Sequence, residues 1–131
     1  MKISKIAIIG LGYVGLPLAV SLARNYKVIG FDINQNRIEE LEKNIDSTLE
    51  IKDEAISSVR DNLNFTSNID DTKECNIHIV SVPTPIDEVN KPNLQPLISS
   101  SKSVGTVIKK DDIVIYESTV YPGVTENLCV N

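Results

Sequence analysis

A glycine-rich turn near the N-terminus constrains the fold more than any other feature of the chain. Gly10, Gly12 and Gly15 follow a continuous apolar run at residues 5–9, which is typical of a strand buried on both faces. Apolar residues at helical spacing follow the turn. The G-x-G-x-x-G spacing is weak evidence alone. With a strand before it, a helix after it and an acidic residue, Asp32, about 20 positions on, it predicts a dinucleotide-binding turn.

Each glycine of this turn has its own physical task. Gly10 permits the tight turn, Gly12 lets a pyrophosphate approach the backbone because it has no Cβ, and Gly15 lets the helix pack close to the strand. Free backbone N–H groups at the positive end of the helix then bind the diphosphate. Tyr13, between the glycines, either covers the cofactor or caps the end of the sheet.

The chain alternates short apolar runs with segments of helical periodicity, which is the pattern of an α/β protein. We expect a Rossmann-like doubly wound parallel sheet of about five strands, with helices on both faces, in one domain over residues 1–131. The strands are predicted at residues 5–9, 27–32, 63–66, 76–82 and 112–117.

Two helices carry more detailed expectations. Asn34 is expected to cap the helix after the second strand. The buried stripe of that helix is expected to consist of Ile38, Leu41 and Ile45. A later helix, capped by Asn93, is expected to reach Ile108, with Lys109 and Lys110 at its C-terminal end, where the helix dipole favours cations. Further helices are predicted at residues 52–62 and from Pro122 onward.

Asp32 ends the second predicted strand. Its carboxylate can accept hydrogen bonds from the ribose hydroxyls of an adenosine, and its charge repels a 2′-phosphate, so NAD is favoured over NADP. The alternative is that Asp32 merely ends a strand. Two interpretations of Arg37 stay open. It lies at the 2′-phosphate or adenine side of the cofactor site, or it is a solvated charge on a helix.

Two other strand ends carry hydroxyl groups. Thr84 lies between Pro83 and Pro85, and Ser118 and Thr119 follow the last predicted strand. Ligands of open parallel sheets bind outside the carboxyl ends of the strands, so these hydroxyls are candidate contacts. A turn followed by a helix cap is the alternative, and composition alone favours it.

Charge and composition exclude several classes of function. The chain has 13 basic and 18 acidic residues, a net charge of −5, which disfavours a nucleic-acid or polybasic membrane surface. Residues 6–23 lack charge, but glycines and a proline interrupt them, so neither a signal peptide nor a membrane span is expected. Cys75, Cys129 and the single His78 cannot form a zinc site or a disulfide framework, so we expect no metal and a cytoplasmic location.

Four segments in this order carry a resemblance to a known family: GLGYVGLPLA at 10–19, VPTP at 82–85, PNLQPL at 92–97 and YESTVYPG at 116–123. The whole chain resembles the N-terminal NAD-binding domain of the UDP-glucose/GDP-mannose dehydrogenase family. YESTVYPG, with STLE at 47–50, is most similar to the UDP-N-acetylhexosamine branch, in particular to Vi-polysaccharide-type UDP-N-acetylglucosamine 6-dehydrogenases.

The resemblance implies a four-electron oxidation of the C6 alcohol of a UDP-sugar to a carboxylate by two NAD, in surface polysaccharide biosynthesis. The family's nucleophile is a cysteine in a Gly-Gly-His-Cys-type segment, which this chain lacks. We therefore expect an inactive N-terminal fragment that carries the cofactor half, with the sugar pocket mostly outside it. An edge strand at 112–117 invites dimerisation, so a homodimer or higher homo-oligomer is expected.

The resemblance also names candidate site residues. Val14, Asp32, Arg37, Thr84 and Thr119 match the family's cofactor contacts, and Thr119 matches a residue that helps to place a catalytic water. The full set of candidates is Gly10, Gly12, Tyr13, Val14, Gly15, Asp32, Arg37, Val82, Pro83, Thr84, Ser118 and Thr119.

Three alternative functions stay open at this point. One is a UDP-glucose or GDP-mannose 6-dehydrogenase, and another is a stand-alone nucleotide-binding regulatory module. A third, another Rossmann oxidoreductase, is disfavoured by VPTP and YESTVYPG.

Overall fold

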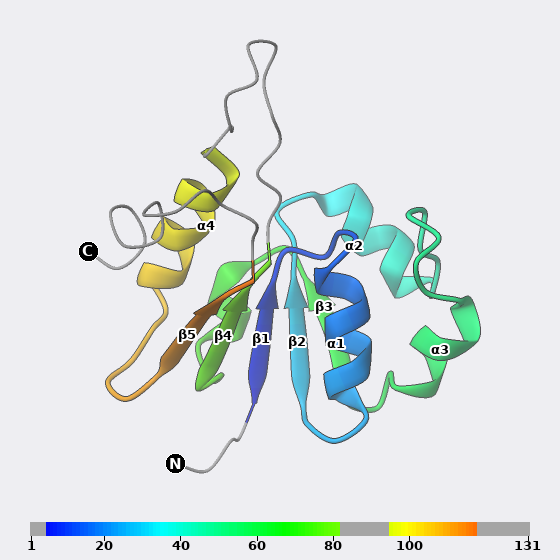
Figure 1. Ribbon diagram of the computed structural model, residues 1–131, viewed down its shortest axis with the longest axis horizontal. Helices are drawn as coiled ribbons and strands as arrows, with labels where there is room; N and C mark the ends of the chain where they lie inside the picture. Colours follow the sequence, from blue (N-terminus) through cyan, green and yellow to red (C-terminus); the bar gives the residue numbers. More distant parts are fainter. Residues whose placement is uncertain (1–4, 82–94, 118–131) are drawn as a thin grey trace.

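A computed structural model describes residues 5–81 and 95–117, which form a parallel sheet between helices (Figure 1). The strands are β1 (Ile6–Ile9), β2 (Val28–Phe31), β3 (Leu63–Thr66), β4 (Ile77–Val80) and β5 (Ile113–Tyr116). The helices are α1 (Gly15–Ala23), α2 (Gln35–Glu42), α3 (Asp53–Ser58), α4 (Gln95–Gly105) and a 3₁₀ turn, η1 (Ile69–Thr72).

The strand order is β3-β2-β1-β4-β5, and every pair is parallel. The chain builds outward from β1 to β3, then crosses back to lay β4 on the other side of β1. This reversal is the topological switch point at which doubly wound proteins bind their ligands. The predicted fold class, a Rossmann-like parallel sheet of five strands, is confirmed.

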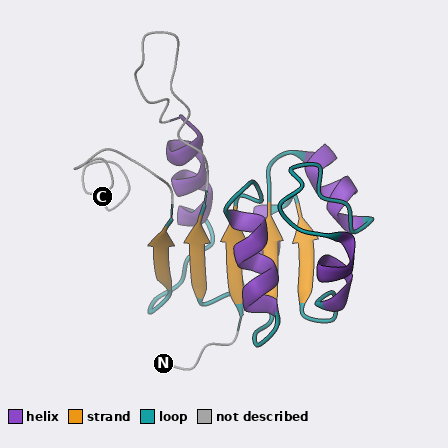
Figure 2. Cartoon of the chain, turned by 45° about the vertical axis from the view of Figure 1, so that its right-hand side comes forward, coloured by secondary structure: helices purple, strands orange, loops and turns teal. Residues whose placement is uncertain are grey.

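Alternate residues of each strand pack on opposite faces of the sheet. Ile6 and Ile8 of β1 pack in a cluster with buried residues of α1, α2 and α3. Ala7 and Ile9 pack in a second cluster with Leu97 of α4. Helices therefore cover both faces, and Figure 2 shows α1 across the nearer one. Because both faces are covered at the centre of the sheet, β1 is a continuous apolar run that is buried throughout.

The helix after β2 is shorter than predicted. α2 ends at Glu42, and Asn44 takes the left-handed conformation with φ 61°. The chain turns there, so Ile45 leaves the helical stripe and is 45% exposed, whereas Ile38 and Leu41 are buried as predicted. Asn tolerates the left-handed region better than most residues, which explains why the helix ends here. α3 is also shorter than its predicted range of 52–62.

The helix of the β4–β5 crossover also ends early. α4 stops at Gly105, so Ile108 lies outside it and is 46% exposed. Lys109 and Lys110 follow the helix instead of lying in its last turn, and the prediction that they complement its dipole is wrong. The Lys109 ammonium instead donates to the Cys75 carbonyl oxygen and the Asp112 carboxylate.

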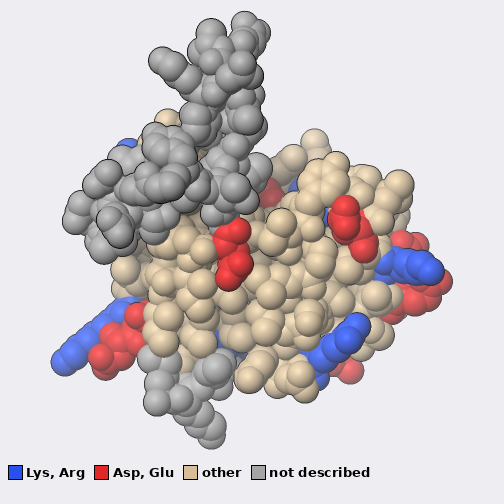
Figure 3. All heavy atoms as spheres, in the orientation of Figure 1, with Lys and Arg blue, Asp and Glu red and all other residues tan. Residues whose placement is uncertain are grey.

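Several predictions lie outside the described residues: the loop at 83–92, the Asn93 cap and the helix from Pro122. Within the described part, no helix has the length and apolarity needed to cross a membrane. On the face shown in Figure 3, acidic and basic side chains lie in small groups on a largely uncharged surface.

Candidate functional site

The glycine turn joins β1 to α1 at the carboxyl edge of the sheet, which is the side formed by the C-terminal ends of the strands. Gly10 has φ 103°, in the left-handed region where glycine is favoured, and its N–H donates to the Phe31 carbonyl at 2.8 Å. A Cβ on Gly15 would lie 1.8 Å from the Gly10 carbonyl oxygen, so only glycine lets α1 begin this close to the end of β1. The turn itself therefore requires Gly10 and Gly15.

Gly12 differs from Gly15 because a Cβ there would meet no atom of the described residues within 4 Å. Within residues 5–81 and 95–117 no side chain caps the N-terminus of α1, and the first turn of α1 carries no acidic residue. Tyr13 and Val14, beside Gly12, are 68% and 57% exposed. The described part of the fold therefore leaves room for a side chain at position 12, and the space there fits a ligand group that approaches the backbone, as the phosphates of a dinucleotide do.

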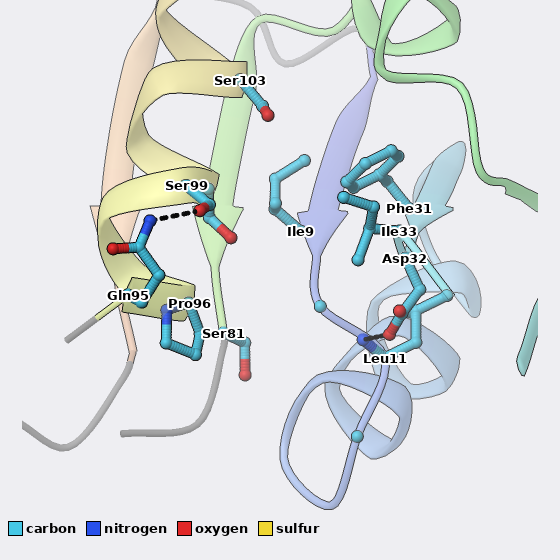
Figure 4. Close-up of a pocket in the computed structure, with 13 residues that line it drawn as sticks. Ile9, Leu11, Phe31, Asp32, Ile33, Ser81, Gln95, Pro96, Ser99 and Ser103 are labelled. Atoms are coloured by element: carbon cyan, nitrogen blue, oxygen red, sulfur yellow. Dashed lines mark hydrogen bonds between the residues drawn. The ribbon is translucent and has the colours of Figure 1, made fainter. Parts of the chain in front are cut away.

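A pocket of about 550 Å³ adjoins the turn, between the ends of β1 and β2 and the helix α4 (Figure 4). Ile9 and Phe31 form apolar walls, and the Asp32 carboxylate lies beside the turn. The remaining lining residues are Gly10, Leu11, Gly12, Ile33, Ser81, Gln95, Pro96, Ser99, Ser100 and Ser103. Such a mixture of apolar walls and a few polar groups is typical of small-molecule sites.

The polar residues of α4 in this pocket were missed by the sequence reasoning. Gln95, Ser99 and Ser103 recur every four residues and so share one face of the helix, and the Gln95 amide donates to the Ser99 hydroxyl at 3.1 Å. Leu97 and Val104 are the buried residues of the same helix. The available signal was the polar stripe of Gln95, Ser99 and Ser103, which lies on the helix that follows the fourth strand.

Asp32 is held by two backbone N–H groups. Its Oδ2 accepts from Leu11 at 3.0 Å, and its Oδ1 accepts from Asn34 at 2.9 Å. Each carboxylate oxygen retains a second lone pair, so Asp32 can still accept from ribose hydroxyls. That contact stays a prediction. The carboxylate is oriented by the turn that it borders.

Arg37 is not a solvated helix charge, and that interpretation was wrong. Its side chain is 9% exposed. Nε donates to the Leu11 carbonyl oxygen at 2.7 Å, and Nη1 bonds the carboxylates of Glu40 and Asp46. Arg37 therefore contacts the glycine turn directly, and a contact with a cofactor stays a prediction.

The remaining five candidates lie outside the described residues: Val82, Pro83, Thr84, Ser118 and Thr119.

Two other chemically reactive residues, Cys75 and His78, are packed in the fold. Cys75 is fully buried, and burial raises the pKa of its thiol to about 11, too high for a nucleophilic thiolate. His78 is also fully buried, with Nε2 3.2 Å from the Asp112 carboxylate, as expected for a packed histidine. Within residues 5–81 and 95–117, no three His, Cys, Asp or Glu side chains gather as a metal site requires.

Comparisons with known proteins identify this arrangement. Residues 4–131 match the NAD binding domain of the UDP-glucose/GDP-mannose dehydrogenase family. The chain is 58% identical over 130 residues to a UDP-N-acetyl-D-glucosamine 6-dehydrogenase from Pseudomonas aeruginosa, covering 99% of this chain and 31% of that protein. A Salmonella typhi protein of the same name is 56% identical over 126 residues, covering 96% and 29%.

A solved structure agrees with these relatives. The UDP-D-ManNAc dehydrogenase from Pyrococcus horikoshii superimposes with a TM-score of 0.89 at 34% identity, covering 95% of this chain and 30% of that one. The chain thus spans about a third of the length of the relatives that it matches. The match to the family's NAD binding domain also confirms NAD as the predicted cofactor. The chain belongs to the UDP-glucose/GDP-mannose dehydrogenase family, and it carries the family's NAD binding domain.

Proposed function

We propose that this chain is the NAD-binding domain of a UDP-N-acetylhexosamine 6-dehydrogenase, which oxidises the C6 alcohol of a UDP-sugar to the uronate for surface polysaccharide biosynthesis. The observation that carries the proposal is the difference in sequence identity between two kinds of relative. Two UDP-N-acetyl-D-glucosamine 6-dehydrogenases are far more similar to this chain than the UDP-D-ManNAc dehydrogenase of solved structure. UDP-N-acetylglucosamine is therefore the favoured substrate.

The described residues supply the adenosine end of the cofactor site. The space over Gly12 and the N–H groups of the first turn of α1 would hold the pyrophosphate. Asp32 would accept from the ribose, and the pocket between Phe31 and α4 would hold the base. We assign the nicotinamide end to Thr84 and Thr119, from their match to the family's contacts. Bound NAD supplies the hydride acceptor for the oxidation.

The chemistry of the sugar is assigned to parts of the enzyme beyond these 131 residues. The chain contains no Gly-Gly-His-Cys segment, and the raised pKa of the buried Cys75 thiol removes it as a substitute. A cytoplasmic location and a homo-oligomer that uses the β5 edge complete the proposal. Within the described residues β5 pairs with β4, and its Ile113 and Ile115 are 42% and 39% exposed.

A domain exchange tests this proposal. The chain replaces the matching N-terminal segment of the Pseudomonas aeruginosa relative, and NADH formation is followed with UDP-N-acetyl-D-glucosamine. We expect sugar-dependent NADH from the chimera, because the two domains share 58% identity. The same chimera carrying Gly12→Val is the control, and it should stay folded and inactive.

The isolated chain provides the second arm. It should bind NAD weakly and produce no NADH with the sugar. Sugar-dependent NADH from the 131 residues alone would contradict the assignment of the chemistry elsewhere. A folded chimera that binds NAD but oxidises no UDP-sugar would favour the nucleotide-binding regulatory module.

A further inference from the structure

The peptide groups of Leu11, in the middle of the glycine turn, are held from both sides. The Leu11 N–H donates to Asp32 at 3.0 Å, and its carbonyl oxygen accepts from Arg37 Nε at 2.7 Å. The Leu11 side chain is fully buried. These bonds orient the backbone between Gly10 and Gly12, which is the segment that a pyrophosphate would approach. The position of Arg37 therefore bears directly on the shape of the turn.

Arg37 is in turn held by a carboxylate from a different segment. Asp46 lies in the loop after α2, and its Oδ1 accepts from Arg37 Nη1 at 2.9 Å. Both side chains are buried, at 9% and 0% exposure. Arg37 Nη2 is buried and donates to no partner among the described residues, so the side chain is held through Nε and Nη1. Glu40, one turn further along α2, is the other carboxylate on Nη1, and it is more exposed than Asp46. Asp46 is therefore the buried anchor of this guanidinium.

Asp46 is itself fixed by its own loop. Its Oδ1 also accepts from the Thr48 N–H at 3.0 Å and the Thr48 hydroxyl at 2.6 Å, while Oδ2 accepts from the N–H groups of Glu50 and Ile51, both at 3.0 Å. Burial alone would raise the pKa of Asp46, but these bonds and the one from Arg37 outweigh it and hold the pKa below its ordinary value. Asp46 is therefore charged at neutral pH, and these hydrogen bonds orient its carboxylate.

We propose that Asp46 is a positioning residue for the cofactor turn: it holds Arg37 against the Leu11 carbonyl and so presets the backbone that receives the pyrophosphate. No described contact joins Asp46 to the pocket, so it acts only through Arg37. The inference rests on the proposed function for the identity of the ligand. The competing explanation is purely local, with Asp46 serving only to close its own loop.

The first test needs no ligand. Amide hydrogen exchange is measured by NMR in the free 131-residue chain, for wild type, Asp46→Asn and Thr48→Val. Asp46→Asn removes the charge and one acceptor oxygen, so we expect the Leu11 amide to exchange about tenfold faster. The Ile79 amide in β4 serves as the internal reference for global stability. Thr48→Val removes a loop hydrogen bond but leaves the Arg37–Asp46 pair, so the Leu11 amide should keep its wild-type exchange rate.

The second test measures NAD affinity by calorimetry in a double-mutant cycle. Asp46→Asn should weaken NAD binding about tenfold in the wild-type background and less than about twofold in the Arg37→Leu background. Equal losses in both backgrounds would overturn the proposal, because Asp46 would then act without Arg37. A Leu11 exchange rate unchanged in Asp46→Asn would overturn it as well. If neither the wild type nor any variant bound NAD, the proposed function would fail. The exchange experiment would still decide whether Asp46 positions the glycine turn.

Discussion

The carboxyl edge of the sheet, at the C-terminal ends of its strands, and the amino edge, at their N-terminal ends, carry similar chemical groups in different arrangements. At the carboxyl edge, Asp32 lines a pocket beside the glycine turn, and the buried Arg37 donates to the Leu11 carbonyl of that turn and to the Asp46 carboxylate. At the amino edge, Asp112 accepts from the Lys109 N–H at 2.9 Å and its ammonium at 3.0 Å, and lies 3.2 Å from His78 Nε2. His78 lies in β4, and Lys109 and Asp112 precede β5, so these amino-edge groups connect the two strands.

This contrast teaches that buried charge does not by itself mark a site. Both edges hold a buried carboxylate paired with a cation, and Asp46 and Asp112 both have a lowered pKa. Among the described residues, Arg37 at the carboxyl edge continues the network to the Leu11 carbonyl, in a turn beside unfilled space, whereas Lys109 at the amino edge continues it to the Cys75 carbonyl before β4. Unfilled space next to oriented polar groups therefore distinguishes the ligand-binding edge from the structural one.

Gly15→Ala should produce the largest effect, a loss of stability, because position 15 of the glycine turn has no room for a side chain. The new Cβ would lie 1.8 Å from the Gly10 carbonyl oxygen, so α1 must move away from β1. We expect the free energy of unfolding in urea to fall by more than about 3 kcal/mol. Gly105→Ala is the matched control, since a Cβ there meets no atom within 4 Å in the part of the chain that the structure describes. Equal stability of Gly15→Ala and wild type would refute the closed geometry of the turn.

Gly12→Val should separate binding from folding. Its side chain enters open space, so the urea midpoint should stay near that of wild type, while NAD binding by calorimetry should disappear because the methyl groups occupy the place of the pyrophosphate. A folded Gly12→Val variant with wild-type NAD affinity would mean that the ligand binds elsewhere. The difference between Gly12 and Gly15 would then no longer indicate where the ligand binds.

Asp32 should determine which nicotinamide dinucleotide binds. Like charges 4 Å apart repel by about 4 kcal/mol at an effective dielectric constant of 20. Solvent screens part of this repulsion, so we expect NAD to bind more tightly than NADP by about 1–3 kcal/mol in parallel titrations. Asp32→Asn should reduce this difference. Equal affinity of wild type for both dinucleotides would contradict the role of Asp32.

Asp112→Asn should have the smallest effect, confined to stability. Burial raises the pKa of Asp112, but hydrogen bonds from Lys109 and His78 outweigh it and leave the pKa below its ordinary value of 3.8. The carboxylate therefore contributes stability above that pH, about 1–2 kcal/mol, and loses it as the pH falls through the folded-state pKa.

The measurement is urea unfolding of wild type and Asp112→Asn at several pH values. The difference between them should be constant above about pH 5 and should shrink in acid. NAD affinity at neutral pH should be the same in both. A weaker NAD affinity in Asp112→Asn would break the distinction between the two edges.

The sequence predicts the sheet well and the charged networks poorly. Short apolar runs bounded by turn residues mark the strands, and β3 at Leu63–Thr66 coincides with its prediction. Helix ends fail where one residue, such as Asn44, adopts an unusual backbone conformation. Local patterns give no sign that Arg37 would turn to Leu11 and Asp46, because those partners become neighbours only after β1, β2 and α2 have packed.

The strand order also has a consequence for the timing of folding. Ile6 pairs with Val28 on one side and with Ile77, much later in the chain, on the other. Loop-closure entropy favours the nearer pairing, so β1, β2 and β3 can associate before β4 joins. Ser81, just after β4, donates its N–H to Ile9 at 2.7 Å, and its hydroxyl would lie 3.4 Å from a Cβ on Gly15. During synthesis from the N-terminus, the Ile9 carbonyl therefore gains this bond, and the pocket gains Ser81 as a lining residue, only after β4 has left the ribosome.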